Sequence, residues 1–143
     1  MILSFLSKSD LLLLDQLNKK DFSDGWKLNQ LECAFESGRF FAIGAFDGKK
    51  LIGAITVSRS FDDADIEGVV TDSEFRKHGV ASELIDRAQV ELEKLGVKRA
   101  LLEVRENNIV ARSLYKKKGF TELSVRKKYY SDGENAVVMV KEF

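Results

Sequence analysis

The chain has 143 residues, of which 44% are hydrophobic and 32% are charged, an ordinary composition for a globular protein with one apolar core. Its 23 basic and 23 acidic residues cancel, so it lacks the strongly positive overall field by which many nucleic-acid-binding proteins find phosphate backbones. The single cysteine, Cys33, excludes an intramolecular disulfide and a multi-thiolate metal site, and we expect it to be a buried or half-buried apolar side chain.

The N-terminal segment is predicted to form a strand followed by two helices. Residues 1–6 (MILSFL) favour a strand, and Ser7 or Ser9 can cap the leucine-rich helix that follows. A second helix is expected after Trp26. The segment lacks a basic leader and a small-residue cleavage site, and no apolar run reaches the length of about eighteen residues that a membrane span needs. We therefore expect a cytoplasmic protein with no membrane contact.

Three consecutive strands are predicted in the middle of the chain. Residues 39–59 contain two apolar runs separated by Asp47 and Gly48, a pair that is a strong signal for a hairpin. Residues 64–71 form the third strand, in which Gly68 indicates a bulge or a close backbone neighbour.

The second half alternates between helices and strands. Residues 79–96 place apolar side chains on one helical face and end at a glycine suited to a left-handed cap. A strand begins at Leu101, a helix carrying Tyr115 follows, and residues 120–130 and 136–143 are predicted to be the last two strands. The alternation implies a parallel crossover, and the hairpins imply antiparallel pairing. The expected fold is therefore one α/β domain, residues 1–143, whose mixed sheet has helices on both faces.

A glycine-containing loop precedes the long helix. Residues 75–82 (FRKHGVAS) have Arg-x-x-Gly-x-Ala spacing from Arg76 to Ala81, and Lys77 and His78 add positive charge. Because the first amides of a helix are unpaired and lie at the positive end of its dipole, such a loop can bind a phosphate. The alternative is an ordinary helix start with solvated basic residues.

Two side chains in residues 101–120 (LLEVRENNIVARSLYKKKGF) are unusual for purely structural positions. Glu103 interrupts an apolar strand, and Tyr115 lies on the inward face of the next helix. A carboxylate and a phenol can act as a general base and a general acid. Alternatively, Glu103 is a solvated strand residue and Tyr115 a core residue with its hydroxyl at the edge.

With the preceding loop, this stretch resembles the GNAT family of N-acetyltransferases, and in particular the branch that acetylates protein N-termini. That branch shows Leu-Glu-Val-Arg, then Asn, Ala, Leu-Tyr and Gly-Phe, which match residues 102–105, Asn108, Ala111, 114–115 and 119–120. The resemblance is strong over residues 64–143.

The resemblance implies a GNAT fold of about seven strands, mostly antiparallel, in which the fourth and fifth strands are parallel and splay apart. It also implies acetyl-CoA as the acetyl donor, no metal, Glu103 as general base and Tyr115 as general acid. The cofactor-binding residues it implies are Val69, Val70, Thr71, Arg76, Lys77, His78, Gly79, Val80, Ala81, Ser82 and Asn108.

The acceptor implied by the resemblance is a protein N-terminus, with the N-terminal alanine of a small-subunit ribosomal protein as the first choice. The alternatives are a small-molecule amine acceptor, such as a polyamine, and an acyl-CoA-binding module without turnover. We expect a monomer or a weak homodimer that makes no direct contact with nucleic acid. Residues 65–70 (DIEGVV) depart from the family pattern, which has a more apolar strand there. The carboxylates of the acidic run from Asp62 to Glu67 are hypothesised to attract a basic peptide.

Overall fold

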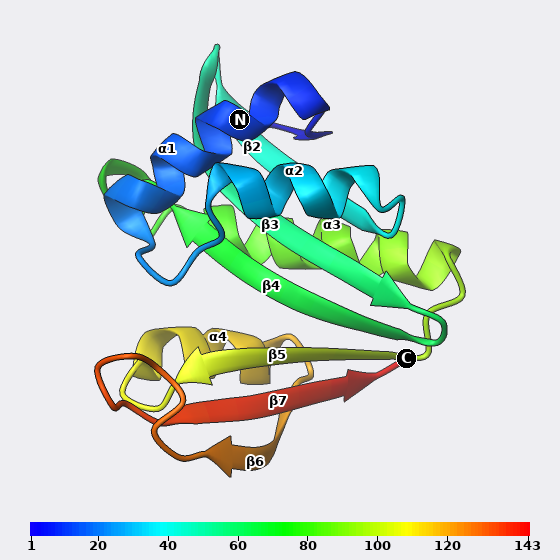
Figure 1. The fold of residues 1–143 in the computed structure, drawn as a ribbon, viewed down its shortest axis with the longest axis vertical. Coiled ribbons are helices and arrows are strands. Elements are labelled where there is room, and N and C mark those ends of the chain that lie inside the picture. Colours follow the sequence, from blue (N-terminus) through cyan, green and yellow to red (C-terminus); the bar gives the residue numbers. More distant parts are fainter.

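The computed structural model describes residues 1–143 and is built on one seven-stranded sheet with the strand order β1-β2-β3-β4-β5-β7-β6 (Figure 1). The strands are β1 (Ile2–Phe5), β2 (Phe40–Asp47), β3 (Lys50–Ser60), β4 (Asp63–Thr71), β5 (Arg99–Arg105), β6 (Thr121–Arg126) and β7 (Ala136–Glu142). The α-helices are α1 (Leu11–Asp21), α2 (Leu28–Glu36), α3 (Val80–Lys94) and α4 (Ile109–Lys117), and two short 3-10 helices are η1 (Lys8–Asp10) and η2 (Ser73–Phe75).

The two halves of the sheet meet at the parallel pair β4–β5, and the other neighbouring strands are antiparallel. The β4–β5 register runs from Asp63 opposite Arg99 to Ile66 opposite Leu102. Beyond these four pairs the strands diverge, as Figure 1 shows. Backbone groups on the facing edges of both strands therefore lack a strand partner past Ile66 and Leu102.

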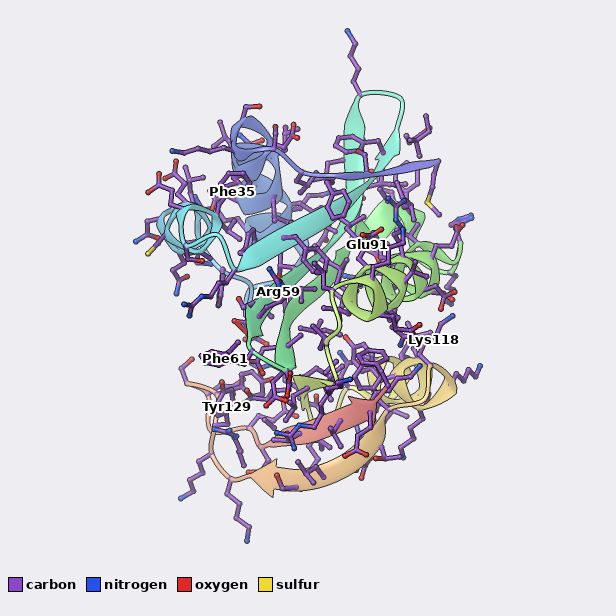
Figure 2. All side chains as sticks on the ribbon, turned by 90° about the vertical axis from the view of Figure 1, so that its right-hand side faces the viewer. Phe35, Arg59, Phe61, Glu91, Lys118 and Tyr129 are labelled. Carbon is purple, nitrogen blue, oxygen red and sulfur yellow. The ribbon has the colours of Figure 1, made fainter.

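Helices cover both faces of the sheet, with α1 and α2 on one side and α3 and α4 on the other (Figure 2). Alternation along the strands explains this, because neighbouring residues point to opposite faces. On β2, Ala42 belongs to the core cluster formed with α1 and α2, whereas Ile43 belongs to the larger cluster formed with α3. None of the helices has both the length and the hydropathy needed to cross a lipid bilayer.

The predicted order of strands and helices is confirmed, as are the mixed sheet and its parallel central pair. Two details differ. Ser7 precedes η1, and α1 begins only afterwards at Leu11. The strand predicted over residues 120–130 ends at Arg126, and the chain then turns away from the sheet.

Cys33 is exposed, so the prediction of a buried or half-buried side chain is wrong. It lies on α2, whose one buried residue is Leu31. The short helix therefore packs along a narrow apolar stripe, and the position of Cys33 faces away from it.

Candidate active site

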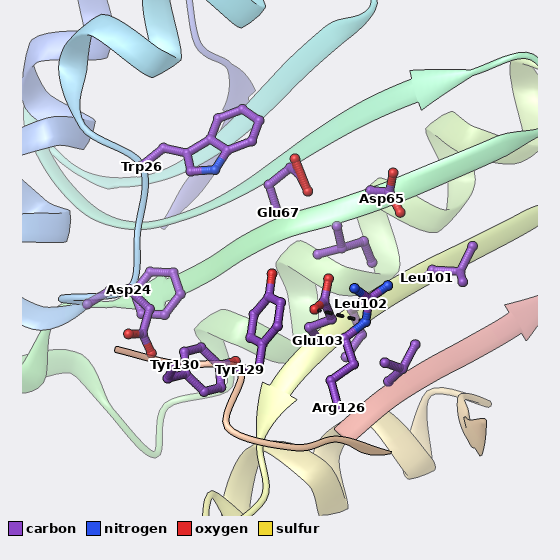
Figure 3. Close-up of a pocket in the computed structure, with 13 residues that line it drawn as sticks. Asp24, Trp26, Asp65, Glu67, Leu101, Leu102, Glu103, Arg126, Tyr129 and Tyr130 are labelled. Carbon is purple, nitrogen blue, oxygen red and sulfur yellow. Dashed lines mark ion pairs between the residues drawn. The ribbon is translucent and has the colours of Figure 1, made fainter. Parts of the chain in front are cut away.

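A cavity of about 170 Å³ opens where β4 and β5 separate (Figure 3). Its wall combines side chains from both strands with residues from the α1–α2 loop, from the end of β6 and the loop that follows it, and from β7. The lining residues are Phe22, Asp24, Trp26, Asp65, Ile66, Glu67, Leu101, Leu102, Glu103, Arg126, Tyr129, Tyr130 and Val138. Four carboxylates and one guanidinium give this wall a net negative charge, which suits a cationic amine.

A β-bulge places Glu67 in the cavity wall. In the β3–β4 ladder, Thr56 lies opposite Gly68 and Val57 lies opposite Ile66, so Glu67 is an extra residue on β4 without a partner. A bulge re-aims the side chain at the point where it occurs. Gly68 is required beside it, because a Cβ at that position would come within 2.8 Å of the Phe22 ring. The predicted bulge at Gly68 is therefore confirmed.

The acidity of Glu67 is reduced by its surroundings. Burial, followed by the nearby charges of Asp65 and Glu103, raises the pKa of Glu67 to about 7. The pKa of Asp65 is also raised, again mainly by burial and next by Glu103. A carboxyl group with a pKa close to neutral exchanges protons readily at physiological pH, which is the property a general base or acid needs. In the sequence Glu67 is one of several carboxylates in an acidic run, and only the neighbouring Gly68 indicates the bulge that brings it into the cavity wall.

Glu103 lies across the cavity from β4, on the face of β5 that carries the odd-numbered residues. Its Oε2 is 3.6 Å from Nε of Arg126, the ion pair drawn in Figure 3. Glu103 also contributes to raising the pKa of Tyr129, after the effect of burial. Arg126, Tyr129 and Tyr130 were not predicted as site residues, because the sequence pattern had assigned them to a strand.

Aromatic rings form the remaining wall. The Tyr129 and Tyr130 rings meet edge to face, with centroids 5.1 Å apart, and Trp26 stacks on Phe40 at 6.3 Å. Burial is the main cause that raises the pKa of Tyr130 to about 12. Rings of this kind give a rigid apolar wall with polar tips, and they can contact a peptide backbone or the aliphatic part of an amine.

Tyr115 does not line this cavity. It is buried in the main core cluster and packs edge to face on Phe120, with ring centroids 6.1 Å apart. Burial raises the pKa of its hydroxyl to about 12, with a smaller effect from Tyr130. The inward-facing position predicted for Tyr115 is correct, and the hydroxyl keeps its proton throughout the neutral range.

The loop predicted to bind phosphate precedes α3. Arg76, Lys77, His78 and Gly79 are exposed, Val80 is buried, and Ala81 and Ser82 are half-buried. Lys77 and Gly79 both adopt positive φ angles, 67° and 79°. Such alternation turns successive amides toward one side and creates a concavity for an anion.

The start of α3 leaves these amides available. Gly79 is the N-cap and makes no side-chain capping bond, and the first helical bond runs from Glu83 N to Gly79 O at 3.1 Å. A Cβ at Gly79 would meet nothing within 4 Å, so the space in front of the helix end is open. The residues of this loop therefore fit an incoming phosphate group.

The other residues predicted to contact the cofactor lie along the divergence of the strands. Val70 is buried, whereas Val69 and Thr71 are half-buried at the end of β4. Asn108 is exposed and caps α4, because its Oδ1 accepts a hydrogen bond from Ala111 N at 3.2 Å. Its amide nitrogen makes no capping bond and remains a donor.

The acidic segment 62–67 does not act as one unit. Asp63 is paired with Arg99 through two hydrogen bonds of 3.0 and 3.3 Å, while Asp65 and Glu67 line the cavity. Of the carboxylates in this segment, only Asp65 and Glu67 are therefore placed to attract a basic peptide into the cavity.

Comparison with known proteins gives one family. Residues 10–120 match the family model described as Acetyltransferase (GNAT) family. A [ribosomal protein bS18]-alanine N-acetyltransferase of Escherichia coli is 36% identical over 96 residues, and this match covers 65% of the present chain and 64% of the relative's length. The protein of the same name from Haemophilus influenzae is 30% identical over 142 residues, which cover 96% of each chain. The crystal structure of the E. coli ribosomal-protein-S18-alanine N-acetyltransferase superposes with a TM-score of 0.88 at 26% identity, covering 99% of this chain and 92% of that one.

Proposed function

The chain belongs to the acetyltransferase (GNAT) family, and from this premise we propose that it transfers an acetyl group from acetyl-CoA to the α-amine of a protein N-terminus. The N-terminal alanine of a small-subunit ribosomal protein is the first acceptor to test, because proteins named for that activity are 30–36% identical to this chain.

One observation carries the proposal: the acidic, aromatic cavity lies at the divergence of β4 and β5 and contains a carboxyl group with a pKa of about 7. A peptide α-amine has a pKa of about 7.7 to 8.0, so transfer of its proton to such a carboxylate is close to balanced. A lysine side chain, with a pKa of about 10.4, would need a much stronger base. The cavity chemistry therefore favours an α-amine over a lysine.

Acetyl-CoA, when bound, supplies the acetyl group as a thioester. The amides at the start of α3, with Arg76 and Lys77 beside them, would hold its phosphates, and the free edge of β4 at Val69 and Thr71 would hold its pantetheine arm. Asn108 would contact the same arm through its amide nitrogen. The open helix end and the unpaired strand edges support these assignments.

The chain's own groups would handle two protons. Glu67 or Glu103 would accept a proton from the amine, directly or through water, and the pKa of Glu67, about 7, lies close to that of an α-amine. Tyr115 holds a proton at its hydroxyl and would donate it to the leaving sulfur. The backbone amides along the open edge of β4 would stabilise negative charge that develops on the carbonyl oxygen. Direct attack by the amine needs no nucleophile from the protein, and Cys33 lies on α2, outside the cavity lining.

The test is thiol release from acetyl-CoA with a short peptide that begins with alanine. The same peptide with a blocked α-amine and a polyamine serve as comparisons. We expect turnover only with the free N-terminus. Turnover only with the polyamine would replace the proposed acceptor by a small-molecule amine, and binding of acetyl-CoA without turnover of any acceptor would indicate a binding module.

A further inference from the structure

Arg105, the last residue of β5, forms ion pairs with more residues than any other side chain of the protein. Its Nε and Nη2 donate to the two carboxylate oxygens of Asp24, at 2.7 and 2.9 Å. Its Nη1 donates to Asp132 at 2.7 Å and to Glu134 at 2.8 Å. The guanidinium also lies over the Tyr130 ring, 4.2 Å from the centroid. One cation therefore joins three carboxylates and an aromatic ring.

These partners come from two loops that are remote in sequence. Asp24 belongs to the α1–α2 loop, which also supplies Trp26 to the cavity wall. Asp132, Glu134 and Tyr130 belong to the β6–β7 loop, which supplies the cavity's two tyrosines. The two loops form facing parts of one wall, and Arg105 donates hydrogen bonds to both loops. Figure 3 shows Asp24 and Tyr130, one from each loop, close together in this wall.

The position of Arg105 follows from strand alternation. Glu103 and Arg105 are two residues apart on β5 and so lie on the same face of the sheet. Glu103 lines the cavity, and Arg105 lies one step further toward the end of the strand, where the loops cross. Arg105 and two of its partners are partly shielded, with side-chain exposures of 24% for Arg105, 26% for Asp24 and 18% for Glu134, whereas Asp132 is 60% exposed. Ion pairs shielded to this degree are stronger than those on an open surface.

Without the guanidinium, the three carboxylates would repel one another. The planar guanidinium of arginine can bind one carboxylate with two parallel hydrogen bonds and use its remaining N–H donors for other carboxylates, which a lysine ammonium cannot do. The position of Arg105 therefore requires the planar, multi-donor guanidinium of arginine as well as its positive charge.

We propose that Arg105 is a positioning residue that holds the α1–α2 loop and the β6–β7 loop together and so sets the shape of the acceptor cavity. The part that concerns the acceptor rests on the proposed function. Arg105 does not contact the reacting atoms in this role; it acts through Asp24 and Tyr130, which line the cavity.

The experiment compares Arg105→Met and Arg105→Lys with Arg99→Met. Arg99 is the matched control, because it lies on the same strand and face and makes an ion pair with Asp63 at the opposite end of β5. The first readout is amide hydrogen exchange of the two loops in the full chain. The second is the separation of kcat from the KM for the acceptor peptide and the KM for acetyl-CoA.

For Arg105→Met we expect faster exchange in residues 22–27 and 127–135 together, with β2 and β3 unchanged. The KM for the acceptor should rise about tenfold or more, since several charge-assisted hydrogen bonds are lost, while the KM for acetyl-CoA stays within about twofold. Arg105→Lys should fall between the wild type and Arg105→Met. Arg99→Met should change neither loop.

Three results would overturn the proposal: faster exchange in only one loop, an acceptor KM unchanged by Arg105→Met, or an equal acceptor effect from Arg99→Met. If Arg105→Met does not fold, Asp24→Asn removes one side of the connection and should speed exchange in residues 22–27 alone. Hydrogen exchange is measured without an acceptor and therefore tests the loop connection by itself. If the wild type does not turn over the peptide, the proposed function is wrong, but the exchange result still decides whether Arg105 connects the loops.

Discussion

Replacing Glu67 by glutamine tests the central electrostatic feature of the cavity. The pKa of Glu67 is raised from 4.5 to about 7, so the folded protein binds more protons than the unfolded chain between these two pH values. Its stability therefore falls as the pH rises through this window. Because a glutamine side chain does not ionise, Glu67→Gln should not lose stability as the pH rises through this window. The variant should be relatively more stable above about pH 7 and similar to the wild type near pH 4.5.

The size of the effect follows from the shift. At about 1.4 kcal/mol per pKa unit, the full shift corresponds to ~3.4 kcal/mol. Glu67 is only partly buried, and solvent screens its charge, so we expect about 1 to 2 kcal/mol. For a chain of this length each kcal/mol moves the melting temperature by roughly 2–4 °C.

The assay is thermal unfolding of the wild type and Glu67→Gln from pH 4.5 to 8.5, with Glu93→Gln as the control. Glu93 is an exposed carboxylate on α3, outside the cavity. The difference in melting temperature between Glu67→Gln and the wild type should grow by several degrees between pH 4.5 and 7 and then level off. The corresponding difference for Glu93→Gln should stay flat.

A constant difference across this pH range would refute the reasoning, since it would mean that burial and the neighbouring carboxylates do not perturb Glu67. Activity gives an independent reading. If Glu67 is the base, kcat/KM of the wild type should fall below pH 7 as Glu67 is protonated, and Glu67→Gln should keep only the pH dependence set by the acceptor α-amine, whose pKa is about 7.7 to 8.0.

Three further predictions concern separate parts of the site. Tyr115→Phe should lower kcat about a hundredfold or more while leaving the KM for acetyl-CoA unchanged, because a general acid typically contributes that much; unchanged turnover in a steady-state assay would remove its role as the acid. Gly79→Ala should weaken acetyl-CoA binding, measured by calorimetry. A side chain at φ 79° strains the loop by about 1–2 kcal/mol, and the new methyl group lies at the helix end where a phosphate would bind. Equal affinity would mean that the loop does not hold the phosphates. Asp65→Lys should raise the KM for a basic peptide more than Asp63→Lys does, because only Asp65 lines the cavity, and equal effects in peptide kinetics would favour attraction by the whole segment.

The fold was predictable because its signals are local. The hairpin at Gly48, the bulge at Gly68 and the apolar face of α3 are each determined by residues close together in the chain. The alternation of helices and strands implied a parallel crossover, the family resemblance assigned it to the fourth and fifth strands, and the sheet confirms this pair.

The cavity wall was less predictable, because it depends on residues that the fold brings together from a distance. The apolar and aromatic residues after Phe120 favour a long strand, but the strand ends at Arg126, and Tyr129 then joins the cavity wall. The ion pairs of Arg105 connect positions 24, 105 and 134, a relation that no local pattern encodes. Likewise, the pKa of Glu67 is raised by burial, by Asp65 and by Glu103, and Glu103 comes near it only through the parallel pairing of β4 and β5.

The short parallel pairing between β4 and β5 also affects the order in which the strands of the sheet fold. β2, β3 and β4 follow one another in the chain and pair through tight turns, so their contacts close small loops. β5 can pair with β4 only after the whole of α3 has been placed, and only four residue pairs then hold it there. Contacts between distant segments form more slowly than local ones. We therefore expect the three-stranded meander to form first during synthesis and the acceptor cavity to be completed last, when the C-terminal strands dock.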